Sequence, residues 1–237
     1  EFASEVDVQR STILERRACK WLFSGLSVQN LLSKIEHCST RLESIAETRD
    51  GINPGPKSFR TTILNPDGPS KPTWRPVIEG RHVERFRMLP TTEIVDYDPT
   101  LLTRDLKKRG SSFRDPRIFT APKLVNRQTA DTLIFAFDDV GYCTLNSVHN
   151  TRARDGKRST LLYLLGLLNS KALRFYYRKN SEETRDVFPQ VHISALRQLP
   201  IRTINFDDPT DVARHDKMVA LVERMLALHR KLAAATI

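Results

Sequence analysis

The sequence has little of what covalent chemistry usually requires. Its three cysteines form no Cys-x-x-Cys pair, and its six histidines are scattered without the spacing of metal ligands. The glycine-rich phosphate loop, the dinucleotide-binding fingerprint, the Gly-x-Ser-x-Gly turn and the His-Glu-x-x-His zinc motif are missing. We therefore expect no metal, cofactor or catalytic residue in this chain. The cysteines are expected to be idle thiols in a reducing cytoplasm.

Long apolar runs are missing as well. The longest uninterrupted apolar stretch is far shorter than the roughly 20 residues of a membrane-spanning helix. Residues 1–5 show neither the basic nor the apolar part of a signal peptide. These absences predict a cytoplasmic protein without a membrane partner. Because the chain starts at Glu1 and lacks an initiator Met, we expect it to be a piece of a longer polypeptide.

Positive charge is abundant and is concentrated in two segments. The chain has 38 Lys and Arg against 28 Asp and Glu, a formal net charge of +10. Residues 100–127 hold eight basic residues and two acidic ones, and residues 149–185 hold nine and three. Much of this charge lies in loop-like sequence with Gly and Ser, which suits a phosphate backbone better than the amphipathic helix of a membrane-surface protein. The sequence therefore favours a nucleic-acid partner.

The hydrophobic pattern predicts helices at both ends of the chain and strands between them. Helical spacing covers residues 9–39, a Leu-rich and therefore buried helix starts at Leu161, and an amphipathic helix covers Pro209–Ala235. Two shorter helices are expected at Lys171–Tyr177, capped by Asn169-Ser170, and at Ile193–Leu199, which ends before Pro200. Strands are expected at Phe59–Leu64, Glu93–Tyr97 and Lys123–Gln128, and a hairpin is expected from Thr132–Phe137 and Tyr142–Leu145.

These segments predict an α+β fold class, a mixed β-rich domain with packed helices and a long C-terminal spacer helix. The apolar stripe of the last helix is expected to pack against the body or another helix. Its members are Val212, Val219, Val222, Met225, Leu226 and Leu232.

One catalytic pattern is an alternative to nucleic-acid binding alone. Asp67 after a proline, followed by Glu79-Gly80-Arg81, imitates the acidic metal site of Mg²⁺-dependent nucleases. The last position is Arg, however, which does not lose its proton to activate a water. Pro66-Asp67-Gly68 also has the composition of a turn. A further alternative is a protein-interaction fragment built on the helix at 209–235 that binds no DNA.

An ordered succession of motifs is more specific than any single pattern. In chain order the motifs are Asp50–Gly55 (DGINPG), Ile78–Phe86 (IEGRHVERF), Pro122–Thr129 (PKLVNRQT), Asp138–Val148 (DDVGYCTLNSV), Leu161–Lys171 (LLYLLGLLNSK), Phe175–Tyr177 (FYY) and Val191–Ser194 (VHIS). Together they resemble the TaqI-like C-terminal specificity domain of adenine DNA methyltransferases, a target-recognition domain. This domain is found in type IIG restriction–modification enzymes and in related BREX-type methyltransferases.

The resemblance implies a non-catalytic module that recognises a sequence in double-stranded DNA. In such enzymes a separate methyltransferase domain, expected upstream here, binds S-adenosylmethionine and carries an Asn/Asp-Pro-Pro-Tyr/Phe motif. Neither NPPY nor DPPY occurs in this chain, so the cofactor is expected only in the parent enzyme, a site-specific adenine methyltransferase. The expected division is an N-terminal helical connector (1–45), a DNA target-recognition domain (46–205) and a C-terminal amphipathic spacer helix (206–237).

The predicted DNA contacts come from the charge pattern, because the basic loops at 104–117 and 152–158 follow no family pattern. The predicted DNA-binding residues are Arg81, Lys107, Lys108, Arg109, Arg127, Gln128, Arg152, Arg154, Lys157, Arg158, Arg178 and Lys179. Arg127, Gln128, Arg152 and Arg154 are the candidates for base edges, and the others are candidates for phosphates. Arg127 has the alternative of a buried partner at Asp138 or Asp139. The aromatic run 175–177 is expected to pack in the core rather than stack on bases.

Overall fold

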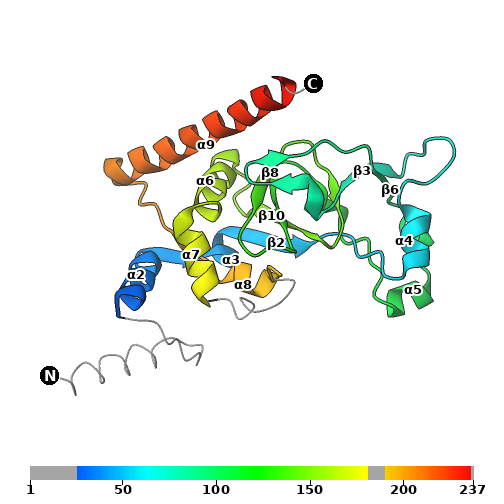
Figure 1. Cartoon of the computed structure of the whole chain (residues 1–237), viewed down its shortest axis with the longest axis horizontal. Coiled ribbons are helices and arrows are strands. Elements are labelled where there is room, and N and C mark those ends of the chain that lie inside the picture. The colour runs from blue at the N-terminus through cyan, green and yellow to red at the C-terminus, as the bar shows by residue number, and fades with distance from the viewer. Residues whose placement is uncertain (1–25, 181–189, 236–237) are drawn as a thin grey trace, which may run out of the picture.

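Short strands lie between two groups of helices, and the expected mixed α+β fold is confirmed (Figure 1). The computed structural model describes residues 26–180 and 190–235. Its helices are α2 (Leu26–Glu36), α3 (Leu42–Ile45), α4 (Lys57–Ile63), α5 (Arg104–Lys108), α6 (Arg158–Leu168), α7 (Lys171–Asn180), α8 (Ile193–Arg197) and α9 (Pro209–Ala235). Residues 9–25 of the predicted N-terminal helix lie outside the described residues.

Within residues 26–180 and 190–235, the strands form four small sheets. They are β1 (Ser39–Arg41), β2 (Ala46–Asp50), β3 (Trp74–Ile78), β4 (Val83–Glu84), β5 (Arg87–Met88), β6 (Ile94–Asp96), β7 (Lys123–Arg127), β8 (Phe135–Asp138), β9 (Cys143–Thr144), β10 (Val148–Ala153) and β11 (Pro200–Arg202). Three 3₁₀ turns connect them, at Gly80–His82 (η1), Pro99–Leu101 (η2) and Pro116–Phe119 (η3). The strand orders are β2-β10-β7-β8, β6-β3-β9, β1-β11 and β4-β5.

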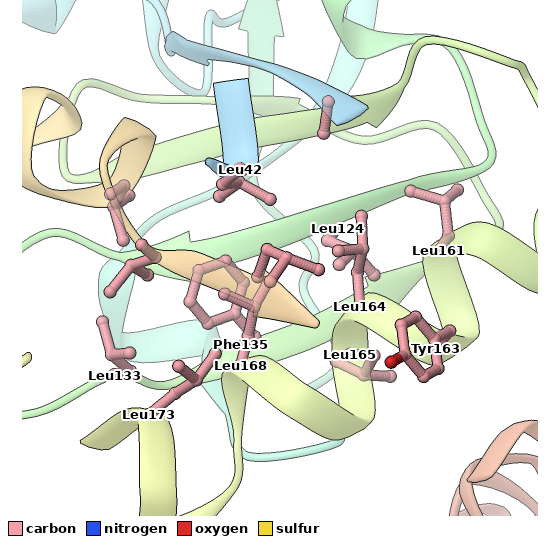
Figure 2. Close-up of a cluster of buried hydrophobic side chains, with 14 of the residues drawn as sticks. Leu42, Leu124, Leu133, Phe135, Leu161, Tyr163, Leu164, Leu165, Leu168 and Leu173 are labelled. Carbon is pink, nitrogen blue, oxygen red and sulfur yellow. The ribbon is translucent and has the colours of Figure 1, made fainter. Parts of the chain in front are cut away.

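The four-stranded sheet carries the main core on one face. Its strands are all antiparallel, with Arg127 opposite Val148 and Asp50 opposite His149. Leu124 and Phe135 of this sheet lie in one buried cluster with the leucines of α6 (Figure 2). An apolar strand face needs such a cover, and a helix that is apolar all round can supply it and also pack against a second helix. The predicted burial of α6 is therefore confirmed.

The C-terminal helix α9 provides that second layer, and its predicted bounds are confirmed. Gly166 lets α9 approach α6 closely, because a Cβ there would meet the Met218 sulfur at 2.7 Å. Val222 and Leu226 are buried in this contact. Met225 and Leu232 of the predicted stripe are instead exposed, together with Leu221 and Leu228. None of the helices in the described parts of the chain is long and apolar enough to span a bilayer.

The second lobe, by which we mean α4, α5 and the segments around a separate buried cluster, contains a correction to the predicted strands. This cluster consists of Ile52, Phe59, Ile63, Val77, Val95, Phe113, Phe119, Cys143 and Leu145. The sequence predicts a strand at 59–64, but residues 59–63 belong to the helix α4, and only Leu64 forms a single β-bridge, with Val95. The i, i+4 spacing of Phe59 and Ile63 puts both side chains into the buried cluster of this lobe. Tertiary burial thus overrides a local strand preference. The strand expected at 93–97 is confirmed as β6, and the strand at 123–128 as β7.

The predicted hairpin of 132–137 and 142–145 is wrong in its pairing. β8 pairs with β7, whereas β9 leaves the sheet and pairs in parallel with β3. The Asp138 carboxylate causes this turn, because it accepts hydrogen bonds from the backbone N–H groups of residues 140, 141 and 142. The same carboxylate bonds the fully buried Lys123, whose Nζ also donates to the carbonyls of Phe119 and Tyr142.

The sheet of β1 and β11 joins segments that are far apart in the sequence, so residues 39–41 of the predicted connector lie against residues 200–202.

The predicted features of α7 are largely confirmed. Ser170 Oγ accepts a hydrogen bond from Leu173 N, which confirms the predicted cap. Tyr177 is buried and Tyr176 packs against the main core cluster, as expected, whereas Phe175 is half-buried and outside that cluster.

Candidate nucleic-acid interface

The structure divides the twelve predicted DNA-binding residues into three groups. The first, which we call the corner, consists of Arg152, Arg154, Lys157 and Arg158, at the end of β10 and the start of α6. The second consists of Lys107, Lys108 and Arg109, on and directly after α5 in the second lobe (Figure 1). The third consists of Arg81, Arg127, Gln128, Arg178 and Lys179, on η1, at the end of β7 and in the last turn of α7.

Backbone carbonyls, and not carboxylates, hold Arg152 and Arg154 of the corner. Arg152 Nη1 donates to the carbonyl of Arg117 at 2.7 Å, and Arg154 Nε donates to the carbonyl of Glu43 at 2.9 Å. A carbonyl orients a guanidinium without neutralising its charge. A guanidinium has five N–H donors, so four remain on each residue after these bonds. Both charges are therefore fixed in direction and available to an anion.

The other half of the corner is a turn that leads into α6. Gly156 has φ +68°, a left-handed conformation that favours glycine. Asp155 is the acid of this turn, and its carboxylate accepts from Lys157 N at 3.0 Å and from Thr160 Oγ1 at 2.8 Å. The side chains of Lys157 and Arg158 are exposed, and the Arg158 guanidinium lies 4.5 Å from the centre of the Phe137 ring. No side chain caps the first N–H groups of α6, which adds partial positive charge here.

The α5 group differs in its support. Lys107 and Lys108 are exposed, and Arg109 is 3.5 Å from Asp105 in the same turn. Thr103 Oγ1 caps the helix by accepting from Leu106 N. The helix has only five residues and ends at Lys108, and Gly110 directly after its C-cap has φ +88°. These lysines can reach an anion, but their direction is not fixed by contacts like those of the corner.

The third group is largely neutralised or used in the fold. Arg81 bonds Glu93 and lies 3.8 Å from Glu79, and Arg178 is 3.0 Å from Asp131. Arg127 donates from Nε to the carbonyl of Gly80 at 2.9 Å, and the structure shows Lys123, not Arg127, as the partner of Asp138. The backbone of Gln128 bonds Ser147 and Val191. Lys179 is exposed.

The residues of the nuclease alternative are not arranged as a metal site. Asp67 is exposed, whereas Glu79 caps η1 and bonds Arg60. Within residues 26–180 and 190–235, no group of three His, Cys, Asp or Glu side chains is placed to hold a metal. Glu79, the acid that would hold the metal ion, is therefore occupied by arginines.

Sequence reasoning missed two positioning residues. Arg117 comes from the first basic segment, and its carbonyl orients Arg152 from the second. Lys123 was counted in the basic surface charge, but it is fully buried. Desolvation lowers its pKa, and the nearby Asp138 charge opposes that shift. The Lys-Leu-Val-Asn pattern of a buried strand was the available signal, because a lysine inside such a strand requires a buried acid.

One family model matches more than half of the chain, and a solved structure shares its fold. The family model of the TaqI-like C-terminal specificity domain matches residues 75–201. The chain is similar to the structure of the type IIG restriction endonuclease BpuSI, with 12% identity and a TM-score of 0.51, over 90% of this chain and 30% of that one. It is also similar to the HsdS subunit from Thermoanaerobacter tengcongensis, with 15% identity and a TM-score of 0.44, over 99% of this chain and 50% of that one. The chain thus spans half or less of these proteins, and no curated protein matches it.

Proposed function

The chain belongs to the family of TaqI-like C-terminal specificity domains, and from this premise we propose that its corner at residues 152–158 is the centre of its contact with duplex DNA. A specificity domain of this family is the DNA target-recognition module of a restriction–modification system. The fold shared with the type IIG endonuclease supports the same architecture. What the membership leaves open is which residues meet the DNA.

One observation carries the choice of the corner, namely that contacts which leave their charge intact orient two of its arginines. Arg81, Arg109 and Arg178 each lie within 4.0 Å of a carboxylate. Arg152 and Arg154 are bonded to backbone carbonyls instead, and the exposed lysines of the α5 group have no such orienting contact among the described residues. Binding of phosphates is driven by cations that release condensed counterions from the DNA, and an ion-paired arginine contributes little to that release.

The corner supplies both kinds of DNA contact. Lys157 and the start of α6 suit phosphate oxygens, because an ammonium group and free helical N–H groups can donate hydrogen bonds to an anion from several directions. Arg152 is held through Nη1 and Arg154 through Nε, which leaves their other guanidinium nitrogens for the O6 and N7 atoms of guanine or for a phosphate. Arg127 is held in the same way, through Nε to the carbonyl of Gly80, and stays a candidate for a base contact.

The rest of the proposal concerns the longer protein. A methyltransferase part that holds S-adenosylmethionine would perform the chemistry, since these 237 residues carry neither NPPY nor DPPY. The proposed partners are therefore double-stranded DNA and that methyltransferase part. The proposed location is the cytoplasm, where such a system meets DNA.

The test compares the corner with an ion-paired arginine. We would titrate the 237-residue chain against a mixed-sequence duplex over a range of salt concentrations. Arg152→Ala with Arg154→Ala is expected to weaken binding by about 1–3 kcal/mol per lost bidentate contact and to flatten the salt slope by about 1–2. The matched control, Arg81→Ala with Arg178→Ala, removes the same charge and is expected to leave the slope nearly unchanged. Equal losses in both double variants would contradict the proposal.

A further inference from the structure

Two arginines outside the twelve predicted residues lie at one junction without an acidic partner. Arg85 is in the two-residue turn between β4 and β5, and Arg174 is the fourth residue of α7. Both side chains are half-buried, and the Nε atom of each is buried without a hydrogen-bond partner. Within residues 26–180 and 190–235, neither guanidinium has a carboxylate in ion-pair range.

The peptide of Phe135 fixes both segments at this junction. Its carbonyl accepts from Phe86 N at 2.9 Å and from Asn169 Nδ2 at 3.0 Å, and its N–H donates to Asn169 Oδ1. Phe86 adopts φ +62°, the left-handed conformation that lets the turn reach this carbonyl. Asn169 ends α6, and Ser170 then caps α7. The turn with Arg85 and the helix with Arg174 are therefore attached to the same residue.

The two charges repel each other. Burial lowers the pKa of Arg85, and the charge of Arg174 lowers it further. An arginine remains protonated under all ordinary conditions, so the repulsion is not relieved by loss of a proton. A half-buried guanidinium with an unsatisfied donor is unfavourable, and a bound anion would satisfy both the charge and the donors.

The surroundings extend the positive charge along one face of α7. Lys171, Arg174 and Arg178 have the i, i+3, i+7 spacing of a single helical face. On the strand side, Arg87 also has a buried Nε without a partner, and its nearest carboxylate, that of Glu84, is 4.0 Å away. Asp131 neutralises Arg178 at the far end of the row. The uncompensated part is therefore the pair Arg85 and Arg174.

We propose that Arg85 and Arg174 form a binding site for a phosphate group, held between the β4–β5 turn and α7. Resting on the proposed function, we assign this phosphate to the backbone of the DNA that the corner contacts. The corner lies at the start of α6, and Arg174 lies on α7, which follows the end of α6. The 11 residues of α6 are about 16 Å long, which corresponds to about five base-pair steps at about 3.4 Å each. The proposal therefore has one duplex lie along α6.

The first test uses inorganic phosphate and needs no DNA. The melting temperature of the 237-residue chain is measured in phosphate and in chloride at equal ionic strength. We expect phosphate to raise it by about 3–6 °C when present at roughly ten times its dissociation constant. Arg85→Gln with Arg174→Gln is expected to abolish this rise. Lys57→Gln with Arg75→Gln removes two exposed charges from the second lobe and should preserve it.

The second test measures duplex binding against salt with the same variants. Arg85→Gln with Arg174→Gln should weaken binding about tenfold and flatten the salt slope by about 1, whatever the DNA sequence. If that double variant does not fold, Arg174→Lys keeps the charge but removes the fork, and it should still lose most of the phosphate effect. A phosphate effect that survives in these variants overturns the inference.

The two tests also separate this inference from the proposed function. If the unaltered chain does not bind DNA, the proposed function fails, while the phosphate titration still decides whether the arginine pair is an anion site. If DNA binding is strong and its salt slope is unaffected by Arg85→Gln with Arg174→Gln, the assignment of the phosphate to DNA is overturned and the proposed function stands.

Discussion

The four-stranded sheet and the second lobe both display basic residues, but they support them differently. At the end of the sheet, Arg152 belongs to β10, whose residues 148–151 are buried, and Arg154 directly follows this strand. A carbonyl of η3 orients Arg152, and a carbonyl of α3 orients Arg154. In the second lobe, Lys107 and Lys108 extend from a five-residue helix. The difference shows that a similar local density of charge produces a fixed contact surface at the end of the sheet and an unoriented one on α5 of the second lobe. Fixed groups lose less conformational entropy on binding.

The largest expected effect tests the link between the two regions. Lys123 Nζ donates to the carbonyl of Phe119 in the second lobe and to the carboxylate of Asp138 in the sheet, and all three residues are buried. Lys123→Met would leave the Asp138 charge unpaired in the interior, so we expect the free energy of unfolding to fall by about 3–5 kcal/mol. Urea denaturation measures this loss.

Its control is Lys123→Met with Asp138→Asn, which removes both charges and should recover part of the stability. The Asn side chain keeps one acceptor for the N–H groups of residues 140–142, whereas the carboxylate uses both oxygens. A loss below about 1 kcal/mol in Lys123→Met would show that the pair does not hold the lobes together, because a broken buried pair normally costs more.

A smaller effect is expected from a direct comparison of the two basic groups. Lys107→Gln with Lys108→Gln should lower duplex affinity by no more than about threefold, less than the loss at Arg152 and Arg154, because flexible lysines contribute charge without fixed geometry. Fluorescence anisotropy with one duplex and one salt concentration gives both values. If the lysine pair loses more than the arginine pair, the centre of the interface belongs to the second lobe instead of the corner.

Much of the fold could be predicted from local signals, and much of the site could not. The bounds of α9, the cap of α7 and the burial of α6 follow from periodicity and capping within short windows. The pairing of β9 with β3 does not, because it joins segments separated by the whole of η1, β4 to β8 and α5. Likewise, the availability of Arg81 depends on Glu93, and that of Arg178 on Asp131. A count of charges shows that a segment is basic, but only the tertiary contacts show which charges remain uncompensated.

The smallest expected effect concerns a second link between the two regions and depends on pH. Asp50 ends β2, and its carboxylate lies 3.0 Å from His149 Nδ1 and 3.6 Å from Arg114 of the second lobe. The close contact with the His149 side chain lowers the pKa of Asp50 below its ordinary value of 3.8, although burial opposes the shift.

Because the folded pKa lies below the unfolded one, the stabilisation is present above pH 3.8 and is lost as the pH falls through the folded value. We therefore expect the free energy of unfolding to fall between pH 5 and pH 3 by less in Asp50→Asn than in the unaltered chain. Arg49→Gln, on the same strand but with an exposed side chain, should keep the unaltered slope. Parallel stability curves for Asp50→Asn and the unaltered chain would mean that His149 and Arg114 do not hold this carboxylate in its charged form.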